Sequence, residues 1–511
     1  MEIFLVLLFV FCCLAYYLNN FLFNYWKRRN FPQAKTQKFF FGNAELMLKG
    51  KRSFGDIFTD LYQLYKNERF IGVYLSYRPV ILVNDPVIIQ DIMIRNFNSF
   101  HDRPVPCNVD VDPLTGNLFF IKGQKWRDLR VKISPTFSSS KIKMMFPIMH
   151  DCGKVLENYI KKQMNEGQKI FEFRDLCARL TTNIIASVGF GLDKNDCINN
   201  RDDIFRKMGL RIFDIDFKQG IKNVIGLLMT PLFEKLRIRL FPEDVEQFFA
   251  SLVADTVDYR EKNNYYRNDF MQLMIQLKNE NFMSPDNDEN QELKKFTMNE
   301  LVAQVFVFFI AGFETSSSTM SYVLLELSKN LDVQRKVQAE IDQVMEKAET
   351  DEITYELLNE MKYLDCCIDE TLRKWPIIPV LFRMATNDYQ IPGSDAVIEK
   401  GTAVYIPVLG MHRDHDIFED PMTFKPERFL NSADGNGKVK GAFYLPFGVG
   451  GRICIGARMG KLQTKLGLAQ IMQKFTVECL DKKLKENDVT FNPTSFIITP
   501  IEKFNLTVSL R

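Results

Sequence analysis

The hydrophobic pattern at the start of the chain differs from the pattern everywhere else. An uninterrupted apolar run covers Ile3 to Tyr17, the stretch to Trp26 stays largely apolar, and three cations follow at 27–29. This length suffices to span a bilayer, and cations behind the span predict that the chain downstream lies in the cytosol. A cleaved signal peptide is the alternative, but its basic residues would precede the apolar run, where Glu2 stands.

Helical periodicity dominates the remainder, with a minor β component. Residues 73–85 predict two strands joined by a turn near 78–79, and short strands are expected again within 389–408. A helix is expected to begin at Gly123 and to end near Pro135, which cannot continue it.

A long apolar helix is predicted near the middle of the chain. Thr297 and Glu300 have the spacing of a capping box, and residues 301–330 are apolar on nearly every face. This pattern predicts a buried central helix. Two polar stretches, Asn279–Glu292 and Asn431–Gly441, predict surface loops.

Two more helices are expected in the C-terminal third. Residues 354–374 predict a single helix that ends at Trp375-Pro376, and another helix runs from about Ile455 to Lys474. One apolar face of the first helix is formed by Leu357, Met361, Leu364, Ile368 and Leu372.

Composition narrows the classes of function. The 511 residues carry a net charge of only +2, which gives no reason to expect a nucleic-acid partner. The ten cysteines are scattered without a CxxC pair, and there are only four histidines. A zinc site or a disulfide framework is therefore not expected, and the pattern is typical of a reducing compartment.

One cysteine has unusual surroundings. Cys454 lies in "FGVGGRICIG", a glycine-rich stretch in front of a predicted helix. Free backbone N–H groups and the helix dipole favour a thiolate there, while the glycines allow close approach of a flat, bulky partner. Phe447 can pack on that partner, and Arg452 supplies a cation. The pattern indicates a thiolate metal ligand beside a large anionic cofactor, and a buried structural cysteine is the alternative.

This stretch, Phe447 to Gly456, matches every defined position of the Phe-x-x-Gly-x-Arg-x-Cys-x-Gly signature of the cytochrome P450 superfamily. Four further stretches resemble family motifs in the family's order: "WRDLR" at Trp126–Arg130, "AGFET" at Ala311–Thr315, "ETLR" at Glu370–Arg373 and "PERF" at Pro426–Phe429. The resemblance covers nearly the whole chain after its apolar start. The chain is most similar to insect microsomal family-six members. This resemblance implies that the protein oxidises plant toxins and insecticides.

The resemblance implies a mainly α fold with a smaller β region, in a single haem-thiolate domain behind an N-terminal membrane anchor. We expect a signal-anchor helix over residues 1–26, a basic and polar linker over 27–43, and a monooxygenase catalytic domain over 44–511. Tyr25 and Trp26 are expected at the membrane surface.

The family's haem contacts carry over to matching positions. Cys454 is implied as the axial ligand of the iron, a role in which a thiolate favours oxygen activation. Phe447 is expected to pack on haem b. The partners expected for the two haem propionates are Trp126, Arg130, Arg383 and Arg452.

Two neighbouring polar residues interrupt the apolar central helix. Glu314 and Thr315 are expected to organise water and relay protons during oxygen activation, while Ala311 leaves room beside them. In a second interpretation the Thr315 hydroxyl bonds to a carbonyl one turn earlier and bends the helix. Both interpretations can hold together.

A structural role is expected for the pair Glu370 and Arg373, which share one face of a helix. Buried together with Arg428, they would form a network that pins the cysteine loop. Side chains expected to contact substrate are Ile310, Ala311, Ile378, Val380, Phe496 and Ile498, all of which suit an apolar ligand.

Electrons must come from a partner, because no phosphate-binding Gly-x-Gly-x-x-Gly follows a strand. The resemblance implies NADPH–cytochrome P450 reductase as electron donor, with cytochrome b5 in some relatives, on the cytosolic face of the endoplasmic reticulum membrane. Basic residues expected to form a docking face, or else only solvated cations, are Lys125, Arg127, Lys132, Lys461 and Lys465.

The sequence therefore predicts a haem-thiolate monooxygenase that inserts one atom of O2 into apolar small molecules, with NADPH as indirect reductant. Alternative functions are hydroxylation of an endogenous hormone or lipid, a haem-thiolate isomerase or dehydratase that works without O2, and a haem protein that only sequesters a ligand. An intact Glu314–Thr315 pair speaks against the isomerase.

Overall fold

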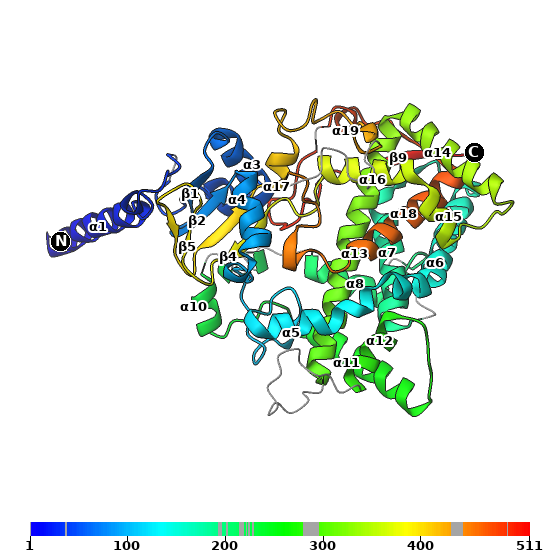
Figure 1. Ribbon diagram of the computed structural model, residues 1–511, viewed down its shortest axis with the longest axis horizontal. Coiled ribbons are helices and arrows are strands. Elements are labelled where there is room, and N and C mark those ends of the chain that lie inside the picture. Colours follow the sequence, from blue (N-terminus) through cyan, green and yellow to red (C-terminus); the bar gives the residue numbers. More distant parts are fainter. Residues whose placement is uncertain are drawn as a thin grey trace.

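The computed structural model describes residues 2–35, 38–192, 197–200, 203–213, 219–220, 222, 225–226, 229–279, 296–430, 443–487 and 489–511. The expected loops at 279–292 and 431–441 lie outside these residues, except Asn279, which ends α12 (Phe270–Asn279). Figure 1 shows a large helical region on one side and the main β-sheet on the side from which α1 (Glu2–Phe23) projects.

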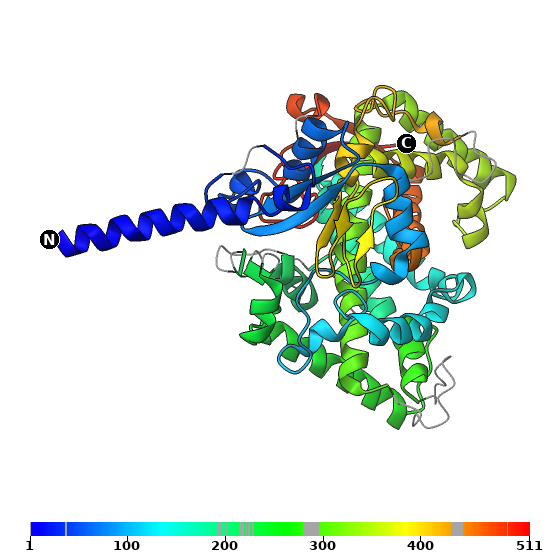
Figure 2. The ribbon, with the colours of Figure 1, turned by 60° about the vertical axis from the view of Figure 1, so that its left-hand side comes forward.

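Among the described residues, two helices are long and apolar enough to cross a membrane. One runs from Ile3 to Arg29 and contains nearly all of α1. No part of its most apolar stretch is buried within the protein. The other is α13 (Met298–Lys329), whose most apolar stretch is 67% buried, as expected for a core helix. Figure 2 shows α1 standing clear of the folded body, whereas α13 runs through it.

The expected interfacial position of Trp26 is wrong. Only 1% of Trp26 is exposed, and its indole N–H donates to the Val73 carbonyl at 3.2 Å. The ring covers Gly72, where an added Cβ would lie 2.3 Å from it. Tyr25 also turns to the domain, and its hydroxyl donates to the Glu399 carboxylate at 2.9 Å. Both aromatic side chains therefore fix the base of α1 to the folded domain.

The main sheet has four strands in the order β1-β2-β7-β4. β1 (Phe70–Leu75) and β2 (Arg78–Val83) are antiparallel, β7 (Ala403–Ile406) runs parallel to β2, and β4 (Leu381–Met384) closes the sheet antiparallel to β7. The first hairpin was predicted, but its turn is at 76–77, because Leu75 pairs with Arg78 and Ser76 adopts a φ of 56°. The sheet brings β4 to the wall of the internal cavity.

Two smaller sheets have the orders β3-β9-β8 and β5-β6. Their strands are β3 (Ile170–Glu172), β5 (Tyr389–Gln390), β6 (Val397–Ile398), β8 (Phe475–Cys479) and β9 (Asn505–Leu510). The other helices are α2 (Glu45–Leu48), α3 (Phe54–Tyr65), α4 (Pro86–Gln90), α5 (Gly123–Ile133), α6 (Ser139–Asn165), α7 (Phe173–Phe190), α8 (Ile204–Phe213), α10 (Thr230–Lys235), α11 (Glu243–Lys262), α14 (Leu331–Lys347), α15 (Tyr355–Glu360), α16 (Lys362–Lys374), α17 (Val408–His412), α18 (Ala457–Lys474) and α19 (Lys482–Lys485).

The central helix is confirmed. The Thr297 hydroxyl accepts from the Glu300 backbone N–H, and the Glu300 carboxylate accepts from the Thr297 N–H, which completes the capping box. α13 packs against α7, α11, α12, α16 and α18, so its apolar sides are covered by neighbouring helices. One long helix therefore carries the 311–315 segment into the middle of the domain.

The single helix expected over 354–374 is divided. Met361, with a ψ of 78°, separates α15 from α16. The Glu340 carboxylate of α14 accepts from the backbone N–H groups of Tyr363 and Leu364 at 2.6 and 3.0 Å, which caps a new helix start. A tertiary contact thus overrides a continuous helical pattern.

Candidate active site

A cavity of about 310 Å³ lies in the interior of the domain, and most of its lining is apolar. α13 contributes the segment from Val307 to Thr319, and α5 contributes Trp126 and Arg130. The stretch from Pro446 to Gly460 forms another wall. The cavity thus gathers three of the motifs identified in the sequence.

The cysteine loop has a backbone that requires its glycines. Gly448 and Gly450 have φ values of 71° and 75°. A Cβ on Gly450 would lie 1.8 Å from the Met93 carbonyl oxygen, so no side chain fits there. The Cys454 N–H donates to the Phe447 carbonyl at 2.9 Å, which closes the loop below the cavity.

The side chain of Cys454 is exposed to this cavity. Burial within the protein raises the pKa of the thiol, although the Gly456 N–H and the cations of Arg130 and Arg103 lower it. In the protein alone, burial thus outweighs the groups that favour the thiolate form of Cys454. A metal ion coordinated at Sγ would supply the missing stabilisation, because a coordinating thiol is deprotonated.

Four arginines line the same cavity: Arg103, Arg130, Arg383 and Arg452. Burial lowers the pKa of each, and the cations of Arg103, Arg383 and Arg130 lower that of Arg452 further. Among the described residues, their only ion pair joins Arg452 to Asp102 at 3.7 Å. The buried Arg383 Nε has no hydrogen-bond partner. Such unbalanced positive charge fits a ligand with two carboxylates, as haem has.

The four arginines are not equivalent. Arg452 donates to three backbone carbonyls, those of His101, Leu118 and Ile121, at 2.7 to 3.1 Å, and its guanidinium lies 4.0 Å from the centre of the Trp126 ring. It thus joins the cysteine loop to the 101–121 segment. Arg103 was missed by the sequence analysis, because it belongs to none of the motifs identified in the sequence.

Glu314 and Thr315, which are neighbours on α13, do not face the same space. Thr315 lines the cavity, and its hydroxyl donates to the Ala311 carbonyl at 2.5 Å, which confirms the bond to the preceding turn. Glu314 is not among the lining residues, and its carboxylate accepts from the Ser318 hydroxyl at 3.4 Å. Burial raises the pKa of Glu314 to about 7, although the Arg174 cation lowers it.

Three of the six expected substrate contacts line the cavity: Ala311, Ile378 and Phe496. Ile310 faces away on α13, where successive side chains point in different directions, and it packs against the main core. Val380 and Ile498 are buried in the core, at 0% and 1% exposure, and are not among the residues that line the cavity. Aromatic lining residues that the sequence did not single out are Phe119, Phe137, Phe270, Phe308 and Phe382.

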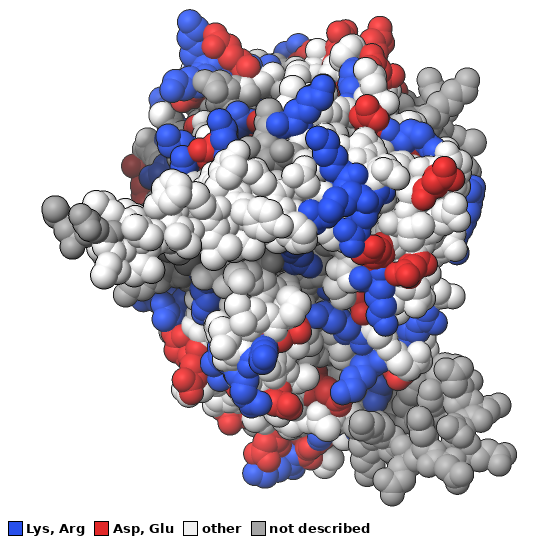
Figure 3. All heavy atoms as spheres, turned by 90° about the vertical axis from the view of Figure 1, so that its left-hand side faces the viewer, with Lys and Arg blue, Asp and Glu red and all other residues white. Residues whose placement is uncertain are grey.

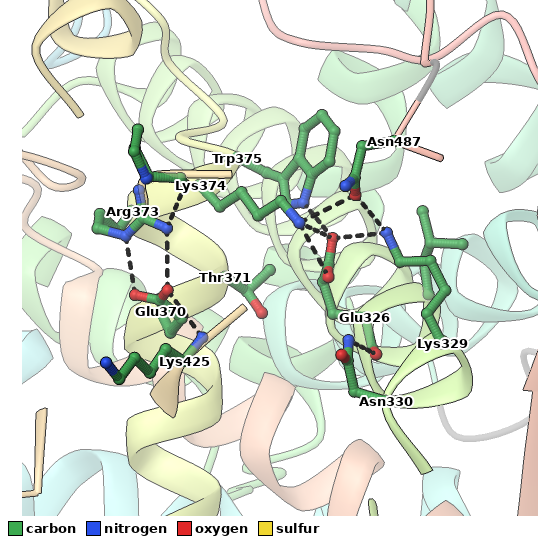
Figure 4. Close-up of polar contacts among 12 residues, drawn as sticks. Glu326, Lys329, Asn330, Glu370, Thr371, Arg373, Lys374, Trp375, Lys425 and Asn487 are labelled. Carbon is green, nitrogen blue, oxygen red and sulfur yellow. Dashed lines mark hydrogen bonds and ion pairs between the residues drawn. The ribbon is translucent and has the colours of Figure 1, made fainter. Parts of the chain in front are cut away.

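The expected network around Glu370 is present and buried (Figure 4). The Glu370 carboxylate accepts hydrogen bonds from the Arg373 guanidinium at 2.8 and 2.9 Å, from the Lys425 backbone N–H at 3.0 Å, and from the Arg428 guanidinium at 3.3 Å. Arg373 also donates to the His412 carbonyl at 2.8 Å. The network therefore fastens α16 to α17 and to the "PERF" segment.

His412 extends this network to the cysteine loop. Its Nε2 accepts from the Leu445 N–H at 3.0 Å, and its Nδ1 lies 3.1 Å from the Arg373 carbonyl oxygen. Nδ1 is thus the protonated nitrogen. Burial and the Arg373 cation lower the pKa of His412 to about 3, so the ring stays neutral. Leu445 lies two residues before the motif, so His412 positions the segment that leads into the loop.

Gln463 provides a second connection, from α18 to the central helix. Its amide donates to the Gly312 carbonyl at 3.0 Å and to the Ser316 hydroxyl. Both acceptors lie within one turn of Thr315. The helix that follows Cys454 is thereby tied to the cavity wall of α13, a link that the sequence did not predict.

The expected basic docking face is only partly available. Lys132 is 7% exposed and lies over the Phe296 ring, and Lys465 is 5% exposed and paired with Asp365 at 2.8 Å. Lys461 bonds to Asp369. Among the five expected cations, Lys125 alone is fully exposed, with Arg127 half-buried.

A helical domain with a cysteine below an arginine-lined apolar cavity defines the haem-thiolate class of enzymes. The family model "Cytochrome P450" matches residues 32–508, and the chain belongs to this family. It is 40% identical over 504 residues to cytochrome P450 6a2 of Drosophila melanogaster, covering 98% of this chain and 97% of the relative. Cytochrome P450 6A1 of Musca domestica is 38% identical, covering 98% and 96%. Cytochrome P450 6k1 of Blattella germanica is 37% identical, covering 90% and 88%.

These comparisons confirm the resemblance to insect family-six members and the mainly α fold. The protein is a cytochrome P450 monooxygenase, an oxidoreductase of the haem-thiolate type.

Proposed function

We propose that this chain is a microsomal monooxygenase that oxidises apolar foreign compounds, such as plant toxins and insecticides. α1 anchors it in the endoplasmic reticulum membrane, with the catalytic domain on the cytosolic face. Electrons come from NADPH through NADPH–cytochrome P450 reductase, with cytochrome b5 as a second donor. The observation that carries the proposal is a cavity with Cys454 at one wall, unbalanced arginines at another and apolar side chains elsewhere.

Haem b, when bound to Cys454, supplies the redox and oxygen chemistry. The chain's own residues hold and surround it. Arg103, Arg130 and Arg383 offer cationic donors to the propionates. Phe447, also at the cavity, packs on the macrocycle.

Thr315 is proposed to position water at the cavity wall, because its hydroxyl oxygen keeps accepting capacity while its proton is held by Ala311. Glu314, with a pKa of about 7, is suited to give and take protons near neutral pH. Since Glu314 does not line the cavity, its protons must reach Thr315 through water or through a side-chain movement.

The substrate class follows from the shape and chemistry of the cavity. Ala311, Ile378 and Phe496 leave an apolar surface with few polar groups to orient a ligand. The likeness to family-six relatives favours foreign compounds over an endogenous hormone or lipid. An endogenous apolar substrate fits the same lining and is the second candidate.

Turnover of the reconstituted holoenzyme tests this proposal. Full-length protein in vesicles with reductase and NADPH should incorporate one atom of labelled O2 into an apolar toxin or insecticide. Product formed without O2 would indicate an isomerase or dehydratase. Ligand binding without any product, across the compounds that shift the haem spectrum, would indicate sequestration and contradict the proposal.

Thr315→Ala should divert reducing equivalents to peroxide and lower the product formed per NADPH. Thr182→Ala is a matched control, because the Thr182 hydroxyl makes the same bond to the preceding turn at 2.7 Å but is not among the cavity-lining residues. Equal coupling in the two variants would remove Thr315 from the proton path.

A further inference from the structure

Gln463 of α18 contacts the central helix beside the segment that carries Thr315. Gln463 is fully buried, and its side-chain amide donates to the Gly312 carbonyl at 3.0 Å and to the Ser316 hydroxyl. All four of these residues line the cavity. A contact between two helices that are distant in the sequence therefore acts on the turn of α13 that borders the cavity.

Small residues allow the helices to approach closely at this turn. An added Cβ on Gly460 of α18 would lie 3.6 Å from the Ser316 hydroxyl oxygen. An added Cβ on Gly312 would lie 2.5 Å from the Cδ1 atom of Ile185 in α7. The turn is thus confined between α7 and α18, and the Gln463 amide is held against it.

The carbonyl oxygens of this turn are fully used. In an α-helix, each carbonyl accepts a hydrogen bond from the N–H group four residues later. The Ala311 carbonyl accepts in addition from the Thr315 hydroxyl at 2.5 Å, and the Gly312 carbonyl accepts in addition from the Gln463 amide. Because a carbonyl oxygen has two lone pairs, neither can accept a further hydrogen bond.

The two hydroxyls of the turn differ in what they can still accept. The Ser316 hydroxyl accepts from the Gln463 amide. The Thr315 hydroxyl donates its proton to the Ala311 carbonyl and accepts no hydrogen bond from the described residues. Thr315 therefore keeps both lone pairs of its hydroxyl for donors inside the cavity. Without the amide, the Gly312 carbonyl and the Ser316 hydroxyl would each regain an acceptor site.

We propose that Gln463 is a positioning residue for oxygen activation, because it occupies the neighbouring acceptors and so keeps water on the Thr315 hydroxyl. This inference rests on the proposed role of Thr315 in positioning water at the cavity wall. Proton transfer requires groups within hydrogen-bond reach, so water held on another acceptor of the turn is out of place. Gln463 thus acts through Gly312 and Ser316 and not by contact with the substrate.

Coupling of the full-length holoenzyme to reductase and NADPH tests this role. Vesicles are used because α1 projects from the domain with no charged side chain among its described residues (Figure 3). In Gln463→Leu, product per NADPH should fall about fivefold and peroxide should rise, since one ordinary hydrogen bond changes a ratio by about this factor. The affinity for substrate, measured from the haem spectrum, should not change. Wild-type coupling in this variant would overturn the inference.

The infrared spectrum of the reduced, carbon monoxide-bound holoenzyme gives a readout that does not depend on turnover. The C–O stretch responds to polar groups beside the bound carbon monoxide. Gln463→Leu should shift or split the wild-type band, because water is distributed over several acceptors. Lower coupling with an unchanged band would indicate a purely structural role and overturn the inference. Gln463→Met, which also lacks the amide, replaces the leucine variant if that variant does not retain haem.

Gln470→Leu is the matched control. Gln470 lies on the same helix, is 5% exposed, and donates its amide to the His150 carbonyl at 3.0 Å, but it is not among the cavity-lining residues. This variant should keep wild-type coupling and the wild-type C–O band. Equal losses in Gln463→Leu and Gln470→Leu would show that any buried amide of α18 has this effect, and would overturn the inference.

Thr315→Ala in the same assays separates the inference from its premise. Lower coupling in Thr315→Ala together with normal coupling in Gln463→Leu would overturn the role of Gln463 alone. Normal coupling in both variants would remove Thr315 from the proton path, and the role of Gln463 would fall with it.

Discussion

At the scale of single residues, the site is defined by charge that the protein does not balance. Four arginines face one cavity, of which Arg383 and Arg452 are buried, and the Nε of Arg383 has no hydrogen-bond partner among the described residues. The thiol of Cys454 has a raised pKa because burial disfavours its charged form. Both features are costly in the protein alone and favourable once an anionic, metal-containing group is bound.

Removing one of these cations should weaken haem retention. Arg103→Leu loses a charge-assisted donor to a propionate, so transfer of haem to an apoglobin acceptor should be about tenfold faster. Arg458→Leu, at an exposed arginine of α18 outside the cavity lining, is the control. Equal transfer rates in the two variants would exclude Arg103 from the haem contacts.

Glu314 should make stability depend on pH. Its pKa rises from an ordinary value near 4.5 to about 7 on folding, so the folded state binds the extra proton between these values. The free energy of unfolding then falls as pH rises from about 5 to 8, by up to roughly 2–3 kcal/mol. Denaturant titrations should show that Glu314→Gln loses less stability over this range. Parallel pH profiles would show that Glu314 titrates normally.

Motif spacing predicted which residues carry the chemistry better than it predicted where they point. Cys454, Trp126, Arg130, Arg383, Arg452 and Phe447 all reach the cavity. Val380, Ile310 and Ile498 were chosen by their place in the chain, but they are not among the residues that line the cavity, whereas Leu381 and Ala311, the neighbours of Val380 and Ile310, are. Trp26 was misplaced because the glycine gap that receives it forms only when β1 folds.

At the scale of elements, two hydrogen-bonded connections support the segments on either side of the cysteine loop. His412 of α17 accepts the Leu445 N–H, and Gln463 of α18 donates to the Gly312 carbonyl of α13. The sequence predicted the Glu370–Arg373 pair from its helical spacing. It did not predict the roles of His412 or Gln463, or the break at Met361, because the partners in each case come from distant parts of the chain.

Replacing His412 should loosen this support. His412→Phe keeps an aromatic ring against Tyr444 but leaves the Leu445 N–H and the Arg373 carbonyl unpaired, at a cost of about 1–3 kcal/mol. The denaturant midpoint should fall, and the thiolate-type haem spectrum should be lost before the helical signal. His415→Phe, three residues later with 71% of its side chain exposed, is the control. Equal midpoints would show that the loop does not depend on His412.

At the scale of the whole molecule, the sheets and the helical region have separate roles. The main sheet receives the base of α1 through β1, while its last strand, β4, supplies Arg383 to the cavity. Other helices surround α13 (Figure 1), and α13 lines the cavity. One folded domain therefore connects the proposed membrane anchor to the proposed haem site. Helical periodicity predicted this division broadly, but the order of the strands depends on long-range pairing such as that of β2 with β7.

The absorption spectrum of the reduced, carbon monoxide-bound protein tests the central assignment, that Cys454 is the iron ligand. Wild type should show the red-shifted Soret band of a thiolate-ligated haem, and Cys152→Ala, at a buried cysteine outside the cavity, should retain it. Cys454→Ala should lose the band. A thiolate-type band that persists in Cys454→Ala would contradict the account.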